Sequence, residues 1–112
     1  MLFEGKLPDF NFGNNEGATC AADLLKPLAD IIEHTPYSQV SNGRFKGGYI
    51  TRHYGKPENN IHAIQLELSQ ATYLAEDTDG YQLDALKKQT ISPILQQLIE
   101  SLLNADQPTF CN

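Results

Sequence analysis

Residues 61–68, IHAIQLEL, constrain the possible folds of this chain more than any other stretch. Every second residue from Ile64 to Leu68 is aliphatic, and alternate side chains share one face of a strand. The opposite face begins with apolar side chains and turns polar only at Gln65 and Glu67. We therefore expect a strand buried on both sides. Its polar residues emerge late in the strand, where α/β sheets place their sites.

A helix is predicted for residues 19–34, because aliphatic side chains recur there at helical spacing. Thr19 is a suitable N-cap for this helix. Pro27 lies inside the span, so the helix either bends there or begins close to Leu25. The side chains of its predicted buried face are Leu24, Leu25, Leu28, Ile31 and Ile32.

A second helix is predicted for residues 82–104. Pro93 either kinks this helix or restarts it, with Ser92 as the N-cap of the second part. The side chains expected to face inward are the neighbouring isoleucines and Leu83, Leu86, Leu95, Leu98 and Leu102.

The remaining segments are predicted as connections and short strands. Residues 1–18 and 69–80 are rich in polar and turn-forming residues and are expected to be loops, and residues 55–60 form a turn. Residues 38–41 are a weak strand candidate, and residues 48–54 are a stronger one. The pattern is α/β, but three strands are too few for a sheet buried on both faces. We therefore expect a piece of a larger domain.

Length and charge restrict the class of protein. A chain of 112 residues is one domain, and it contains no apolar run near the length of a membrane span. We see no secretory signal and expect a cytoplasmic location. The net charge of −6 argues against nucleic acid and anionic lipid as partners. The two cysteines, Cys20 and Cys111, match no metal or redox spacing and are expected to be buried or unpaired thiols.

Residues 42–55, NGRFKGGYITRHYG, concentrate cationic side chains in an otherwise acidic chain. A guanidinium matches a carboxylate in bidentate geometry, so Arg44 and Arg52 are candidates for binding an anion. The neighbouring glycines would let the backbone approach a ligand closely. The alternative is that Gly47 and Gly48 form a turn which the arginines solvate. The stretch is not a phosphate-binding loop of the GxxxxGK[ST] type.

Glu67 is the other candidate for chemistry. A carboxylate on a largely apolar strand must be hydrated, paired or functional. It either forms a structural ion pair with Arg44 or Arg52, or acts as a general base. The spacing of His34, His53 and His62 predicts no metal site, so we expect surface or hydrogen-bonded histidines.

Three stretches together resemble the N-formylglutamate amidohydrolase (N-formylglutamate deformylase) family: LFEGKLPDFNFGNNEGATC, NGRFKGGYITRHYG and IHAIQLELSQATYL. The resemblance extends to about residue 104. It implies a zinc-dependent hydrolase that cleaves N-formyl-L-glutamate to formate and L-glutamate in histidine degradation. The implied fold is a partial three-layer α/β sandwich, like the C-terminal part of a zinc-carboxypeptidase-like (phosphorylase/hydrolase-like) domain.

The resemblance also implies roles for individual residues. Glu67, in QLEL, matches the glutamate that shuttles the proton. Arg44 and Arg52 become candidates for binding the two carboxylates of the substrate. Asn42, His53 and Tyr73 are implied only as residues that line or contact the substrate pocket.

Family members are more than twice as long, so residues 1–112 are expected to be the C-terminal portion of one catalytic domain. The metal ligands would then lie upstream of Leu2, with Met1 an introduced or alternative start. We expect the isolated chain to hold no catalytic zinc, to be inactive and to self-associate as a dimer through an exposed sheet edge. Two alternatives stay open: an amidohydrolase for another N-acyl acidic amino acid, and a non-catalytic anion-binding α/β domain.

Overall fold

The fold is built on a three-stranded mixed sheet in the order β2-β1-β3. The structure, a computed structural model, describes residues 7–74 and 83–105. The central strand β1 pairs in parallel with β2 and antiparallel with β3. Asn11 lies opposite Glu67 in the antiparallel register. The strands are β1 (Phe10–Gly13), β2 (Gln39–Ser41) and β3 (Gln65–Leu68).

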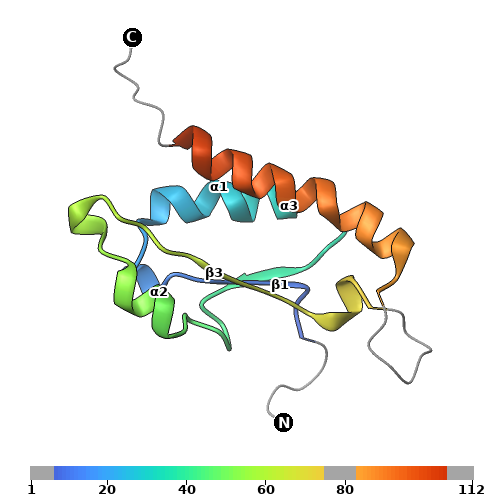
Figure 1. The fold of residues 1–112 in the computed structure, drawn as a ribbon, viewed down its shortest axis with the longest axis horizontal. Coiled ribbons are helices and arrows are strands. Elements are labelled where there is room, and N and C mark those ends of the chain that lie inside the picture. Colours follow the sequence, from blue (N-terminus) through green and yellow to red (C-terminus); the bar gives the residue numbers. More distant parts are fainter. Residues whose placement is uncertain (1–6, 75–82, 106–112) are drawn as a thin grey trace.

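Two long helices, α1 (Ala22–Glu33) and α3 (Ala85–Ala105), lie on the same side of the sheet (Figure 1). Side chains alternate along β1, so Phe10 and Phe12 both point toward these helices and are almost fully buried. They pack with aliphatic side chains from both helices into one core cluster. The helical members of the buried core are Leu25, Leu28, Ile32, Ile91 and Leu98.

The prediction of a loop over residues 1–18 is wrong at β1, where FNFG forms the central strand with all four residues buried. Four residues with an asparagine and a glycine carry little strand propensity. They are held extended because both edges of β1 are paired, with β2 and with β3. Strand 38–41 is confirmed as β2, and turn 55–60 as a short 3₁₀ turn at Pro57–Asn59.

The prediction of a strand over residues 48–54 is also wrong, because Tyr49–Tyr54 form the short helix α2 near one end of the sheet (Figure 1). The Arg52 N–H donates to the Gly48 carbonyl, and the Gly55 N–H donates to the Thr51 carbonyl, both at 3.0 Å. Aromatic and β-branched residues favour a strand. Here only Thr51 is buried, so the apparent alternation does not correspond to two packed faces.

Both long helices begin later than predicted, and of the two alternatives given for each proline the structure excludes a new start there. The Thr19 hydroxyl does not cap α1 but donates to the Ala63 carbonyl at 2.9 Å. Helix α1 begins before Pro27 and contains it, and α3 likewise runs through Pro93 without a new N-cap at Ser92. The predicted buried face of α1 is confirmed at Leu25, Leu28 and Ile32.

The strand predicted at 61–68 is regular only over β3, and Ile61 forms an isolated bridge with Lys56. The expected burial on both sides is wrong, because both long helices cover one face and Glu67 is exposed on the other. Leu98 of α3 is buried as predicted, whereas Leu86 and Leu102 of α3, and Leu83 before it, are exposed. Residues 75–82 lie outside the described residues, and with them most of the predicted loop 69–80. No helix in the described ranges could cross a membrane.

Candidate functional site

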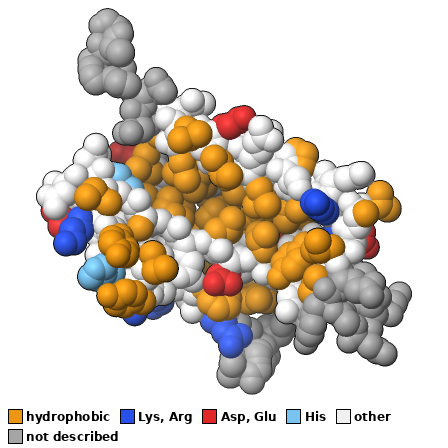
Figure 2. All heavy atoms as spheres, in the orientation of Figure 1, with side chains coloured by type: hydrophobic (Ala, Val, Ile, Leu, Met, Phe, Trp, Pro, Cys, Tyr) orange, Lys and Arg blue, Asp and Glu red, His pale blue; other side chains and the backbone are white. Residues whose placement is uncertain are grey.

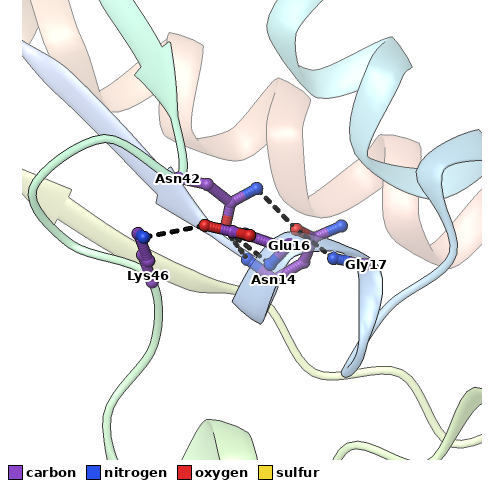
Figure 3. A network of polar contacts seen from close by, with 5 residues as sticks. All are labelled: Asn14, Glu16, Gly17, Asn42 and Lys46. Carbon is purple, nitrogen blue, oxygen red and sulfur yellow. Dashed lines mark hydrogen bonds and ion pairs between the residues drawn. The ribbon is translucent and has the colours of Figure 1, made fainter.

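The parallel strands β1 and β2 end side by side, and an asparagine follows each of them (Figure 3). The Asn42 amide nitrogen donates to the Asn14 side-chain oxygen at 2.8 Å. The Asn42 side-chain oxygen accepts from the backbone N–H groups of Asn14, at 3.1 Å, and of Glu16, at 3.0 Å. These bonds connect the loop after β1 to the loop after β2. Both loops lie at the carboxyl ends of their strands, where α/β sheets place their sites.

The same end of the sheet also contains a cluster of unusual backbone conformations. Asn15, Glu16 and Asn42 have φ of 50°, 55° and 56°, in the left-handed region that non-glycine residues seldom adopt. Gly17 and Gly47 add φ of 96° and 139°. Strained backbone of this kind persists where surrounding contacts fix it, and it concentrates at binding and catalytic sites.

Lys46 closes the network on the side of the cationic stretch 42–55. Its ammonium forms a 2.7 Å ion pair with Glu16, and its carbonyl accepts from the Asn15 N–H at 2.7 Å. The hydrogen bond and charge of Lys46 lower the pKa of the Glu16 carboxyl below its ordinary value. Lys46, one of the cationic side chains of residues 42–55, is therefore paired with a carboxylate of the chain itself.

Glu67 lies on β3 with its carboxylate exposed. That carboxylate accepts from the Gln65 amide at 3.4 Å, and the Gln65 oxygen accepts from the Gly48 N–H at the start of α2. In the described part of the chain, the partner of the Glu67 carboxylate is thus an amide and not a guanidinium. Among residues 7–74 and 83–105, the ion pair considered for Glu67 with Arg44 or Arg52 is not formed.

Asn11, opposite Glu67 in the sheet register, is a buried polar residue that no sequence pattern singles out. Its amide nitrogen donates to the Pro8 carbonyl at 2.8 Å and to the Glu67 carbonyl at 3.4 Å. Its side-chain oxygen is buried and has no hydrogen-bond partner within residues 7–74 and 83–105. Such an acceptor next to an exposed carboxylate marks this face of the sheet as polar and incompletely satisfied.

The other predicted site residues are exposed or lie apart from this face. The Arg44 guanidinium lies 5.7 Å from the centroid of the Phe45 ring. Arg52 and His53 are exposed in the last turn of α2, where the His53 ring stacks on Tyr49 with centroids 5.0 Å apart.

Tyr73 lines a hollow of about 450 Å³ between β3 and α3, on the face of the sheet opposite the Glu67 side chain. The structure therefore brings Asn42 to the strand ends with Lys46, but it does not bring Tyr73 to the Glu67 carboxylate.

The remaining histidines and Cys20 are structural. The His62 ring accepts from the Ala21 N–H at 3.2 Å, beside the start of α1. The Nδ1 atom of His34 lies 2.8 Å from the Asp30 carbonyl oxygen. Cys20 is fully buried and free, and burial raises the pKa of its thiol. Its predicted burial is confirmed, whereas Cys111 lies outside the described residues.

A zinc site does not fit the residues described. Structural and catalytic zinc needs three or four His, Cys, Asp or Glu ligands in one place. Residues 7–74 and 83–105 contain no group of three such side chains that could hold a metal ion. What these residues offer is an exposed carboxylate on β3, an unsatisfied buried amide oxygen beside it, and cationic side chains nearby in sequence. Such groups can accept a proton and bind an anion.

Comparison with known proteins identifies related chains. The sequence model of the N-formylglutamate amidohydrolase family matches residues 1–74. The chain is 50% identical over 103 residues to N-formylglutamate deformylase of Pseudomonas putida, and 48% identical over 104 residues to that of Pseudomonas aeruginosa. Each match covers 91% of this chain, which spans 38% of the length of either relative.

A crystal structure of N-formylglutamate amidohydrolase from Ralstonia eutropha JMP134 superposes with a TM-score of 0.78. The superposition covers 95% of this chain and 36% of that one, at 23% sequence identity. This likeness concerns the fold, and it places the small mixed α/β sheet described above within a larger protein of known structure.

Proposed function

The chain belongs to the N-formylglutamate amidohydrolase family, and on this premise we propose that it carries one side of a deformylase site. The proposed reaction is hydrolysis of N-formyl-L-glutamate to formate and L-glutamate. The observation that carries the proposal is the position of Glu67. Its carboxylate projects from β3 into solvent, with an amide and not a cation as its hydrogen-bond partner.

Glu67 is proposed as the group that moves the proton. Its carboxylate accepts a proton from the attacking water, whose oxygen forms a bond to the formyl carbon. The same proton then passes to the amide nitrogen as the carbon–nitrogen bond breaks, which releases formate and the amine of L-glutamate. Gln65 orients the carboxylate through the 3.4 Å hydrogen bond.

Arg44 and Arg52 are proposed to bind the two carboxylates of the substrate. Both guanidinium groups are exposed and belong to the cationic stretch that leads into β3. Asn42, His53 and Tyr73 are proposed to contact or line the same pocket. Asn42 would do so through the strand-end network, and Tyr73 through the hollow beside β3 that it lines.

The whole enzyme is proposed to be zinc-dependent, to have a zinc-carboxypeptidase-like fold and to serve histidine degradation. Zinc would polarise the formyl carbonyl in such an enzyme. Since the described residues gather no ligand set, the ligands are proposed to come from outside them. We therefore expect no formate release from the isolated 112-residue chain, even with added zinc.

A chimera tests the proposal in a full-length context. The matched segment of the Pseudomonas putida relative is replaced by this chain, and formate release is measured. We expect an active chimera.

Glu67→Gln should lower the kcat of the chimera by about a hundredfold to ten-thousandfold, the usual contribution of a general acid–base group. Arg44→Ala and Arg52→Ala should raise KM by about 10- to 100-fold, because each removes charge-assisted hydrogen bonds. Lys26→Ala is the control, since Lys26 is an exposed residue of α1 paired with Asp30.

Other outcomes would reassign the function. An unchanged kcat for Glu67→Gln would exclude its catalytic role. A chimera active only on another N-acyl acidic amino acid would keep the chemistry and change the substrate. An inactive, folded chimera, together with calorimetric binding of L-glutamate by the isolated chain without metal, would indicate a non-catalytic anion-binding domain. Formate release by the isolated chain with zinc would show that it contains a complete site.

A further inference from the structure

β3 is an outer strand of the sheet, and alternate backbone groups along it face away from β1. The Ser69 N–H donates to the Asp9 carbonyl on the β1 side at 3.0 Å. Because the direction of these groups alternates along a strand, those of Gln65 and Glu67 also face β1. Those of Leu66 and Leu68 therefore point outward. In the described part of the chain β3 pairs with β1 alone, so this outer edge is open to another strand.

Apolar side chains flank the same edge. A hollow of about 450 Å³ lies between β3 and α3, and a second, of about 690 Å³, lies beyond Ile64 among α1, α2 and the end of α3. Leu95, Ile99 and Leu102 follow one another at helical spacing on α3, and Ile99 and Leu102 are 58% and 37% exposed. Figure 2 shows hydrophobic side chains gathered across the middle of this face. Exposed apolar surface beside an open strand edge is typical of a docking surface.

The sequence around Leu66 is self-complementary for antiparallel pairing. When Leu66 is opposite Leu66 of a second copy, Gln65 is opposite Glu67, and Ile64 is opposite Leu68. The outward backbone groups of Leu66 then bond to their own copies, and those of Ile64 bond to those of Leu68. Aliphatic side chains meet on the core face, and amides meet carboxylates on the polar face.

We propose that two copies of this chain join through β3 in this register, as a two-fold dimer with one continuous sheet. The two-fold axis passes through the Leu66 pair, perpendicular to the sheet, so both α3 helices lie on the same face. The stripe of Leu95, Ile99 and Leu102, which is exposed at Ile99 and Leu102, then packs against its own copy. The neighbouring register centred on Glu67 is disfavoured, because it places two carboxylates directly opposite each other.

Sedimentation velocity over a concentration series tests the dimer. The expected result is a reversible shift to twice the 12.5 kDa chain mass as concentration rises. A chain that stays monomeric over the whole series would overturn the proposal and leave the edge to a different polypeptide. Open-ended growth into larger species would overturn the closed two-fold arrangement.

Charge substitutions on β3 test the register. Gln65→Glu sets two pairs of like charges opposite each other across the interface, so the dissociation constant should rise about tenfold. Exchanging the two residues, in Gln65→Glu with Glu67→Gln, should restore the original constant. Gln65→Lys should tighten the dimer, a result that misfolding cannot produce. Gln89→Glu adds the same charge on the exposed part of α3 and should have no comparable effect.

The same series distinguishes the registers. In the Glu67-centred register, residues 65 and 67 are not opposite each other, and Glu67→Gln alone would tighten the dimer by removing a carboxylate pair. A strong gain for Glu67→Gln, with no response to Gln65→Lys, would therefore contradict the Leu66-centred pairing. Circular dichroism of each variant shows whether the fold is kept.

Discussion

At the scale of single residues, Gly13 determines how closely the cationic stretch can approach the sheet. A Cβ at this position would lie 2.7 Å from the carbonyl carbon and oxygen of Lys46 and 2.9 Å from the Phe45 carbonyl oxygen. These are backbone atoms, which cannot rotate away as the end of a side chain can. The missing side chain of Gly13 is therefore what allows Lys46 to meet Glu16 and Asn15 at the end of β1.

Gly13→Ala should destabilise the protein by about 1–3 kcal/mol, because the added methyl forces the backbone of residues 45 and 46 outward. The measurement is chemical denaturation with circular dichroism. Gly48→Ala is the matched control, since a Cβ there would meet only the end of the Gln65 side chain, at 3.1 Å. A Gly13→Ala variant as stable as Gly48→Ala would contradict this reading of the close approach.

At the scale of elements, the sequence predicted those whose own residues carry a pattern. The buried face of α1 follows from the spacing of Leu25, Leu28 and Ile32, and the turn before β3 follows from its Pro and Asn residues. β1 was missed because FNFG has little intrinsic signal and depends on pairing at both edges. Residues 48–54 were mistaken for a strand because β-branched and aromatic residues favour strands, whereas tertiary contacts such as the Gly48–Gln65 bond favour the short helix α2.

The same distinction applies to the candidate site. Glu67 could be singled out from its place in QLEL, since a carboxylate in an otherwise apolar strand is conspicuous. Asn14 and Asn11 could not, because their environment exists only once β1 is placed between its two neighbours. The sequence signal available for the end of β1 was Gly13 followed by Asn14, because both residue types favour turns.

Pro93 is an element-scale feature with a testable cost. Pro93 lies inside α3, so its backbone cannot donate to the preceding turn. Pro93→Ala restores that donor and should raise the free energy of unfolding by roughly 1–3 kcal/mol. Pro57→Ala is the control of opposite sign, because Pro57 begins a 3₁₀ turn where its fixed φ is favourable. A thermal melt in which both variants shift the same way would contradict this account of α3.

At the scale of the whole molecule, one layer of helices covers one face of a small sheet, so a single core cluster joins β1, β3, α1 and α3. α3 contributes to this core through one side and faces the open edge of β3 with the adjacent side. Leu98 is 4% exposed and belongs to the core, whereas its neighbour Ile99 is 58% exposed and belongs to the stripe beside β3. Of these two adjacent residues, Leu98 thus contributes to folding and Ile99 to the proposed association.

Leu98→Ala should lower the free energy of unfolding by about 2–5 kcal/mol, because it removes buried methyl groups and leaves a cavity between α1 and α3. Ile99→Ala should change the stability of the dilute monomer by no more than about 0.5 kcal/mol. It should nevertheless weaken the dimer in sedimentation, since the lost side chain faces the second copy. Denaturation at low concentration, paired with sedimentation at high concentration, measures both effects. If Ile99→Ala destabilised the monomer as much as Leu98→Ala, the exposed stripe would be part of the core, and the open face on which the dimer depends would not exist.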